Sequence, residues 1–367
     1  MSSEATIKDE IGDSQLLRAS SEQIREFALN ALMAAGTQVE AAQSVANALT
    51  ETSMRGVDSH GIRLLPHYIR VVQGGRINPN PKLTFTQTGP GTGIVDGDDG
   101  FGHHASYFAM DRAVAIARNS GVGAVSVINS SHFGAAGSYV LRAANEGHVG
   151  LGFCNSDSFV LAHDGLESFH GTNPIAFAAP VPGSAPLLLD MATSVVPWNR
   201  VQDYLMEGLP LPPDVTVDVA GELTTDATLS AALLPLGGMA YGHKGAGLAS
   251  MIEILCAIMT GSPFCSRLPA MKGPDFSTPR HMGHFFISVD YRRFVAAEIY
   301  EAGIHAYLHA LRSQAAKPGK NVMAPGDREW SVMKERQQRG VPVMRQLKIE
   351  LDQLADGLGV RRIAYTG

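Results

Sequence analysis

The sequence contains little cysteine. Only Cys154, Cys256 and Cys265 occur among its 367 residues, and no two of them have the CxxC spacing. An odd number of cysteines cannot form a closed set of disulfides, so the chain is expected in a reducing compartment, the cytoplasm. The first 20 residues are polar and lack the apolar segment of a secretion signal, so a secreted protein is not expected.

Long apolar runs and basic runs are also missing. Glycine, proline or charge interrupts every apolar stretch well before the ~20 residues that a membrane span needs. Lys and Arg number 29 against 35 Asp and Glu, which gives a net charge of −6 and disfavours binding to nucleic acid. Hydrophobic residues make up 45% of the chain, enough for a large core, and the length corresponds to roughly two domains at ~150 residues each.

The common nucleotide and hydrolase motifs are absent. No GxxxxGK[ST] or GxSxG occurs, and the glycines of residues 89–93 precede an expected strand, the wrong order for a Rossmann turn. Thirteen histidines invite a metal site, but His103 and His104 are adjacent and His281 and His284 have no HExxH partner. We therefore expect no metal ion, with solvated or core histidines instead.

The apolar pattern predicts helices at both ends and a mixed α/β sheet between them. Helices are expected over 21–36, from Thr37 to Met54 with a Thr37–Glu40 capping box, from Pro66 to before Gly74, and over 104–119, 135–145, 244–259, 294–313, 328–339 and 343–358. Strands are expected at 94–95, 122–128, 149–154, 175–179, 187–189 and 285–289. This order predicts a tail (1–19), a helical module from both ends (20–80 and 291–367) and a central α/β domain (81–290).

The first polar cluster is RGVDSHGIR, from Arg55 to Arg63. His60 and Arg63 are three residues apart, so both side chains share a face of a helical turn. A guanidinium binds a carboxylate with two hydrogen bonds, and an imidazole transfers a proton near neutral pH. The alternative is a capped helix start with an exposed arginine.

The second cluster is NSSHFGAAG, residues 129–137, between an expected buried strand and a helix. Open α/β folds bind ligands at such places, where a helix N-terminus attracts anions. His132 would act on substrate or touch a phosphate there; the alternative is a histidine packed in a turn of small residues.

Two further segments contain candidate polar groups. GTNP (171–174) is followed by LDMATS (189–194), in which Asp190 ends an apolar strand. The alternative interpretation of Asp190 is a helix N-cap. GHKGAG (242–247) opens an apolar helix, where Lys244 suits an anionic ligand such as phosphate or is otherwise a solvated lysine in a glycine-rich cap.

Together, RGVDSHGIR, SSHFGAAG, GTNPIAFAAP, LLLDMATS and GHKGAG resemble the non-Rossmann malate/L-lactate dehydrogenase family, over about residues 21–360. This family includes ureidoglycolate and sulfolactate dehydrogenases, diketogulonate reductase and cyclic imino acid reductases. The resemblance implies a non-Rossmann α/β fold with a mixed-sheet domain that binds NAD or NADP, a small carboxylate substrate, and a homodimer with its active site near the subunit contact.

The resemblance also implies roles for single residues. His132 is similar to the proton acceptor of the ureidoglycolate-type enzymes, and His60 with Ser59 to the proton donor of the reductases. Arg63 corresponds to the substrate-carboxylate clamp, and Thr172 lies near the substrate. The implied cofactor contacts are His132, Phe133, Gly134, Ser156, Asp190, Met191, Ala192, Lys244 and the closing turn Pro325, Gly326 and Asp327.

The chain departs from the imino acid reductases where they carry an aspartate about ten residues after the LDMATS aspartate. Here the stretch reads PWNRV (197–201), with Arg200 near that place. This favours a 2-hydroxy or 2-oxo acid such as malate, lactate or ureidoglycolate. The alternatives are a cyclic imino acid or diketogulonate reductase, a metal-assisted hydrolase, or a binding protein without activity.

Overall fold

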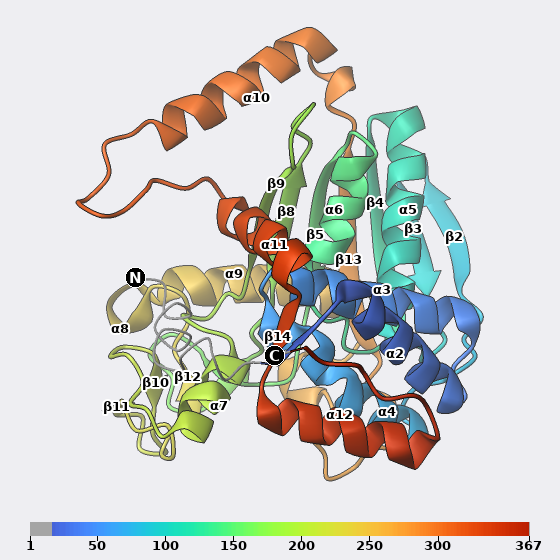
Figure 1. The fold of residues 1–367 in the computed structure, drawn as a ribbon. Helices are drawn as coiled ribbons and strands as arrows, with labels where there is room; N and C mark the ends of the chain where they lie inside the picture. Colours follow the sequence, from blue (N-terminus) through green and yellow to red (C-terminus); the bar gives the residue numbers. More distant parts are fainter. Residues whose placement is uncertain (1–16, 367) are drawn as a thin grey trace.

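A seven-stranded mixed sheet runs through the middle of the computed structural model, which describes residues 17–366 (Figure 1). Its strands lie in the order β2 (Thr84–Gly89), β3 (Thr92–Asp96), β4 (Val122–Ser130), β13 (Met282–Val289), β5 (Val149–Cys154), β8 (Ile175–Ala179) and β9 (Leu187–Met191). Only β3 and β4 pair in parallel; the other neighbours are antiparallel. The predicted mixed α/β class is confirmed, and the glycines of residues 89–93 form the β2–β3 hairpin.

Helices cover both faces of this sheet because its central strands alternate their side chains between the faces. In β13, Phe286 packs beneath α5 (Gly102–Ser120) and α6 (Gly137–Asn145), in one core with Val125 and Tyr139. Phe285 points to the other face, in a smaller core with Ile252 of α9 (His243–Glu253). A π-helical turn, η4 (Ile254–Ile258), extends α9.

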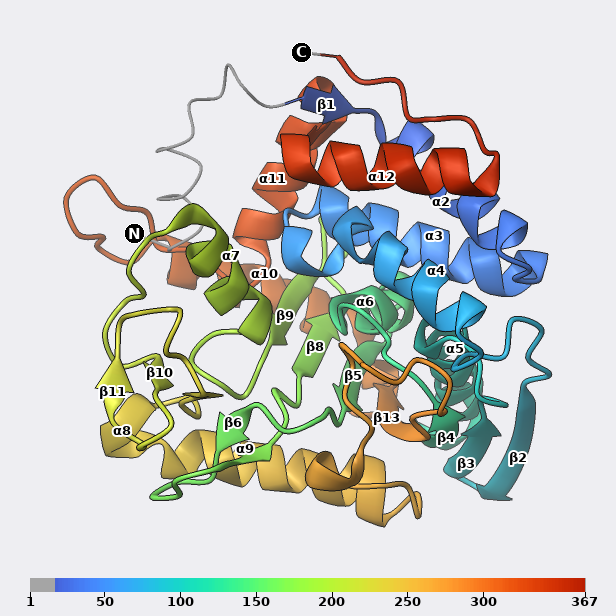
Figure 2. The ribbon, with the colours of Figure 1, turned by 90° about the horizontal axis from the view of Figure 1, so that it is seen from below.

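The two chain ends share a third core, formed where their helices stack together (Figure 2). Its elements are α2 (Ser21–Ala34), α3 (Val39–Met54), α4 (Leu65–Gln73), α12 (Arg345–Leu358) and the strand pair β1 (Leu17–Ala19) and β14 (Val341–Val343), with α11 (Asp327–Arg339) beside α3. The Thr37–Glu40 capping box is wrong: Gln38 is the N-cap of α3 and makes no side-chain bond there. The capping box forms instead at Ser20 and Gln23 of α2.

Helix α10 (Ala297–Arg312) reaches away from the stacked helices (Figure 1). Its buried residue, Leu308, packs with Val181 and Ala324 rather than with the core of the chain ends. The predicted boundaries at 19/20, 80/81 and 290/291 stay a prediction, and most of the predicted tail lies outside the described residues.

A small five-stranded sheet lies beside the main one and was not predicted, because most of its strands are only two residues long. Its order is β11 (Leu223–Thr224), β10 (Thr216–Val217), β12 (Ala232–Leu233), β6 (Val160–Leu161) and β7 (Ser168–His170), accompanied by α7 (Trp198–Glu207) and α8 (Gly238–Tyr241). The short helical turns are η2 (Asp58–His60), η3 (Ile62–Leu64), η5 (Cys265–Arg267) and η6 (Tyr291–Arg293). Within residues 17–366, none of the helices combines the length and apolarity needed to cross a bilayer.

Gly102, the first residue of α5, fixes the position of the loop that follows β4. A Cβ atom on Gly102 would lie 2.2 Å from the carbonyl oxygen of Ser131. We expect Gly102→Ala to lower the free energy of unfolding by about 1–3 kcal/mol, since strand or helix must shift to admit the methyl group. Urea unfolding measures this loss.

Gly303→Ala in α10 is the matched control, because no atom lies within 4 Å of its Cβ position. This substitution should be neutral or stabilise by up to ~1 kcal/mol, since alanine favours a helix. Equal unfolding free energies for the two variants would contradict the close contact between α5 and the loop.

Candidate active site

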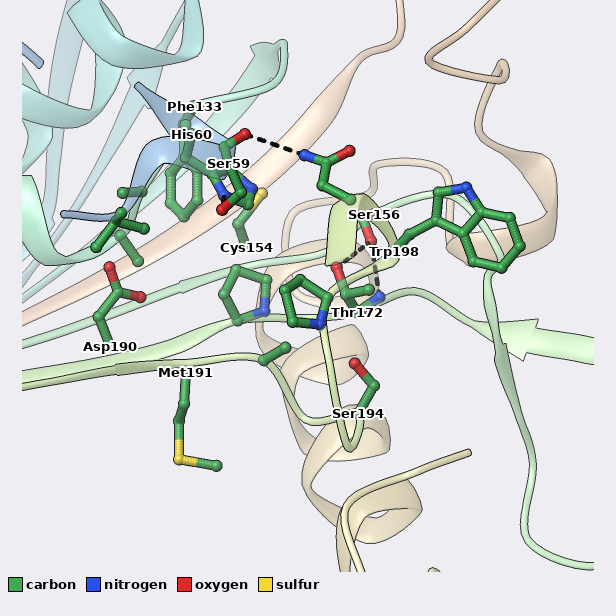
Figure 3. Close-up of a pocket in the computed structure, with 18 of the residues that line it drawn as sticks. Ser59, His60, Phe133, Cys154, Ser156, Thr172, Asp190, Met191, Ser194 and Trp198 are labelled. Atoms are coloured by element: carbon green, nitrogen blue, oxygen red, sulfur yellow. Dashed lines mark hydrogen bonds between the residues drawn. The ribbon is translucent and has the colours of Figure 1, made fainter. Parts of the chain in front are cut away.

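A cavity of about 520 Å³ opens where the main sheet, the small sheet and the chain-end helices meet (Figure 3). Figure 3 shows Ser59 and His60 near Phe133, with Asp190 and Met191 along β9. Most of the predicted site residues line it: Ser59, His60, His132, Phe133, Gly134, Ser156, Thr172, Asp190, Met191, Ala192, Pro325 and Gly326. Segments more than 250 residues apart in sequence therefore share one cavity.

The turn η2 places Ser59 and His60 in the wall. Arg336 of α11, itself buried, holds this turn with two hydrogen bonds to the carboxylate of Asp58 and a third to the carbonyl oxygen of Ser53. From the other side, Asn199 of α7 donates to the Ser59 carbonyl oxygen at 3.1 Å. The turn is thus fixed by both the C-terminal helices and the small sheet's helix.

The loop after β4 places His132. Gly134 in this loop has φ +73°, and a Cβ there would lie 2.8 Å from Nε2 of the buried His103. Both constraints favour glycine. Next to it, Phe133 stacks on the ring of His284, with centroids 4.9 Å apart, and its carbonyl oxygen accepts a hydrogen bond from Tyr139.

The rings of His60 and His132 stack on each other, with centroids 6.0 Å apart and planes 23° from parallel. Nδ1 of His60 is 2.9 Å from the hydroxyl of Ser59, and Nδ1 of His132 is 2.7 Å from the hydroxyl of Tyr68 in α4. Since each Nδ1 has a protein partner, Nε2 is the ring nitrogen that each histidine can offer to a ligand.

Both histidines are neutral at pH 7. Desolvation by the surrounding protein, and then the charge of Arg63, lower the pKa of His60 to about 4. Desolvation and the neighbouring His60 also hold the pKa of His132 well below its usual range. A neutral imidazole with its hydrogen on Nδ1 accepts a proton at Nε2, and the imidazolium that forms can return it, so either ring can serve as a general base and, once protonated, as the acid of the reverse step.

The hydroxyl groups of Ser156 and Thr172 lie together on another wall. The Ser156 hydroxyl accepts a hydrogen bond from the Thr172 amide at 3.0 Å and is 3.5 Å from the Thr172 hydroxyl. On β9, the carboxylate of Asp190 accepts a hydrogen bond from the amide of Gly137, the first residue of α6, at 2.7 Å. Asp190 therefore already occupies part of the helix N-terminus at which the sequence predicted an anion.

Three predicted residues do not line the cavity. Nη1 of Arg63 is 2.5 Å from an oxygen of Asp203 in α7. Lys244 is exposed, with its ammonium over the ring of Tyr241. The carboxylate of Asp327 pairs with Arg312 of α10.

Several lining or contacting residues were not predicted: Arg55 as a lining residue, Tyr68, Trp198, Asn199, Lys272, Arg328 and Glu329. Tyr68 and His132 are 64 residues apart, and no sequence spacing reports their contact. For Arg55, the signal was present, because it begins the RGVDSHGIR cluster.

The residues present fit a nicotinamide dinucleotide. The cavity has the volume typical of cofactor sites, apolar side chains such as Leu188 and Met191 for a flat ring, and the cations Arg55 and Arg328 for phosphates. Among residues 17–366, no three His, Cys, Asp or Glu side chains are grouped to hold a metal ion.

Comparison with known proteins agrees with this geometry. The profile of the malate/L-lactate dehydrogenase family matches residues 19–352. Malate dehydrogenase of Pyrococcus abyssi is 33% identical over 95% of this chain and 97% of its own, and NAD(+) ureidoglycolate dehydrogenase of Escherichia coli K12 is 33% identical over 84% and 88%. The structure of malate dehydrogenase from Pyrococcus horikoshii OT3 superposes with a TM-score of 0.87 at 32% identity, covering 96% of this chain and 98% of that one. The resemblance of the five motifs is thereby confirmed, and the chain belongs to the malate/L-lactate dehydrogenase family.

Proposed function

We propose that this chain is an NAD(P)-dependent dehydrogenase that interconverts a 2-hydroxy carboxylate and a 2-oxo carboxylate. The observation that carries the proposal is the pair of neutral, stacked imidazoles in a cavity that fits a nicotinamide ring. Relatives named for malate and ureidoglycolate, both 2-hydroxy acids, support the substrate class.

His132 acts on the substrate oxygen. In oxidation, Nδ1–H of His132 donates to the Tyr68 hydroxyl, so the free Nε2 accepts the proton of the alcohol and an imidazolium forms; in reduction, this imidazolium returns the Nε2 proton to the ketone oxygen and becomes neutral again. His60, which lies beside His132 and contacts the Ser59 hydroxyl through Nδ1, can accept and return a proton in the same way. The nicotinamide, when bound, takes up or supplies the hydride at the substrate carbon.

Arg63 is assigned to the substrate carboxylate, which requires its guanidinium to reach a ligand in the cavity that it does not line in this structure. Asp203 engages only Nη1, so the Nη2 and Nε side of the guanidinium can donate to a second carboxylate. The charge of Arg63 acts on His60, which supports a carboxylate site beside the proton-transferring ring. Thr172 and Ser156 provide hydroxyl groups nearby.

The cofactor contacts are assigned to the cavity wall that contains Phe133, Gly134, Asp190, Met191 and Ala192. Desolvation raises the pKa of Asp190 to about 6, against the hydrogen bond from Gly137 and the charge of Arg55. Pro325 and Gly326 close the same wall, and Asp327 holds this turn by accepting a hydrogen bond from the Ala324 amide at 2.8 Å. Lys244 is exposed and does not line this cavity, so it would contact only a part of the cofactor that extends beyond the cavity.

A homodimer in the cytoplasm is the proposed state. Ile254, Ile258 and Met259 form an apolar surface at η4, each with more than half of its side chain exposed. A second copy of the chain would remove such a surface from water.

The function is tested by following the absorbance at 340 nm with NADH or NADPH and a panel of 2-oxo acids, with a cyclic imine for the imino acid alternative. We expect 2-oxo acid reduction that a chelator does not inhibit, whereas a chelator would inhibit a metal-assisted hydrolase.

His132→Gln should lower kcat about 10²- to 10⁴-fold and retain cofactor binding, since it removes the proton-transferring group.

His104→Gln is the matched control, because His104 bonds to Ser44 and does not line the cavity. Its kcat should equal that of the wild type. Unchanged kcat in His132→Gln would remove the assigned role, and a wild type that oxidises neither nucleotide with any acid would refute the function.

The lowered histidine pKa values predict an unusual pH profile. For oxidation of the hydroxy acid, the base His132 must be neutral, and its pKa lies well below the usual 6.5, so kcat/KM should stay level as the pH falls through 6.5. An ordinary histidine, with a pKa of ~6.5, would already halve the rate at pH 6.5.

Folding must be monitored in the same pH series. Burial lowers the pKa of His60, His103 and His284 in the folded protein. Below pH 6.5 the unfolded chain therefore binds more protons than the folded one at these three residues, so the free energy of unfolding decreases as the pH falls. Circular dichroism identifies the range in which the enzyme stays folded. A break in kcat/KM at pH 6.5 in folded enzyme would contradict the neutral pair.

Arg63→Lys should raise KM for the 2-oxo acid about tenfold or more and change kcat much less. The reason is that a lysine ammonium cannot make the two parallel hydrogen bonds by which a planar guanidinium binds a carboxylate. Steady-state kinetics separate the two constants. Asp203→Asn shows whether the Asp203 contact supports the clamp or competes with the substrate, since KM rises in the first case and falls in the second. An unchanged KM in Arg63→Lys would remove Arg63 from the substrate site.

A further inference from the structure

Lys272 is a cation in the cavity wall with no role in the reaction described above. It lies in the loop between η5 and β13, and no hydrogen bond or ion pair joins its ammonium to any residue of the described chain. Other cations around this end have partners: Arg63 pairs with Asp203, and Arg280 pairs with Asp157.

The loop holds Lys272 in a fixed place. Arg76 donates from Nη1 to the carbonyl oxygens of Ala270, at 3.0 Å, and Met271, at 3.3 Å. The amide of Met271 donates to a carboxylate oxygen of Asp157 at 3.0 Å. Beyond Lys272, Arg76 also donates to the carbonyl oxygen of Asp275. The backbone is therefore anchored on both sides of Lys272.

This loop also leaves the ammonium of Lys272 without an ion-pair partner within the described chain. Asp157 is the nearby acid, but one of its oxygens accepts from Arg280 and the other from the Met271 amide. Burial and the charge of Arg63 lower the pKa of Lys272 against the attraction of Asp157, and Lys272 lines the same cavity as His60 and His132. Arg63 acts in the same way on His60. An anion bound at Lys272 would therefore lie in the cavity that contains the imidazole pair.

We propose that Lys272 is a specificity-determining residue that binds a second anionic group of the substrate, a carboxylate or a sulfonate, while Arg63 binds the carboxylate next to the reacting carbon. This inference rests on the proposed function. An unpaired ammonium on an anchored loop costs little reorganisation when it binds an anion, and the enclosed site strengthens the attraction. The enzyme should therefore prefer dianionic 2-oxo acids to monoanionic ones of equal length.

The test compares oxaloacetate and sulfopyruvate with 2-oxobutyrate, which has the length of oxaloacetate but no second anion. In Lys272→Met, the ratio of kcat/KM for oxaloacetate to that for 2-oxobutyrate should fall about 10- to 100-fold, mainly through KM, because one charged hydrogen bond is lost. Sulfopyruvate shows whether a sulfonate is accepted at the same place. Lys272→Arg should restore most of the preference.

Lys82→Met is the control for the loss of one positive charge, because Lys82 is exposed and does not line the cavity. Its selectivity should match the wild type. Thermal unfolding of each variant shows that the loop substitutions leave the protein folded.

Two results would overturn the inference. One is a Lys272→Met variant that loses kcat/KM equally for all acids, which indicates a purely structural role. The other is a wild type that prefers 2-oxobutyrate. A wild type that reduces none of the acids with NADH or NADPH refutes the proposed function itself, and the two failures are thereby distinguished.

Discussion

The site depends on keeping two adjacent imidazoles neutral. His60 and His132 come from different parts of the fold, and their stacked rings are held by Ser59 and Tyr68. Desolvation by the surrounding protein lowers both pKa values, and a proton on one ring repels a proton on the other. The shared core of the two chain ends produces this environment, because it fixes α4 with Tyr68 and, through Arg336, the turn with His60.

The same constraint explains why the sheet and the chain-end helices must fit closely. Gly102 brings α5 against the backbone of Ser131 and His132, and Gly134 lets the next turn pack on His103. Side chains at these two glycines would collide with the loop that contains His132 and with His103. The position of His132, to which we assign proton transfer, thus depends on backbone contacts outside the cavity wall.

Local patterns predicted most of the long helices and the main strands, since amphipathic spacing is a property of consecutive residues. They failed for the two-residue strands of the small sheet, which are held by long-range pairing, and for the cap of α3. The polar motifs predicted His60, His132 and the β9 residues of the cavity. Tyr68 was not predicted because its contact with His132 joins segments remote in sequence, and Lys272 was not predicted because its place in the cavity wall depends on a loop that the distant residues Arg76 and Asp157 anchor.

The residues to which we assign proton transfer and the residue to which we assign substrate selectivity lie on different parts of the fold. The imidazole pair is held by α4, by β4 and by the turn η2. Its position is therefore the same whichever substrate binds. Lys272 lies on a loop that Arg76 and Asp157 anchor from outside the sheet. A substitution at this position changes the charge offered to a ligand without altering the elements that hold His60 and His132. Under the proposed roles, one catalytic pair would serve acids that differ only beyond the reacting carbon.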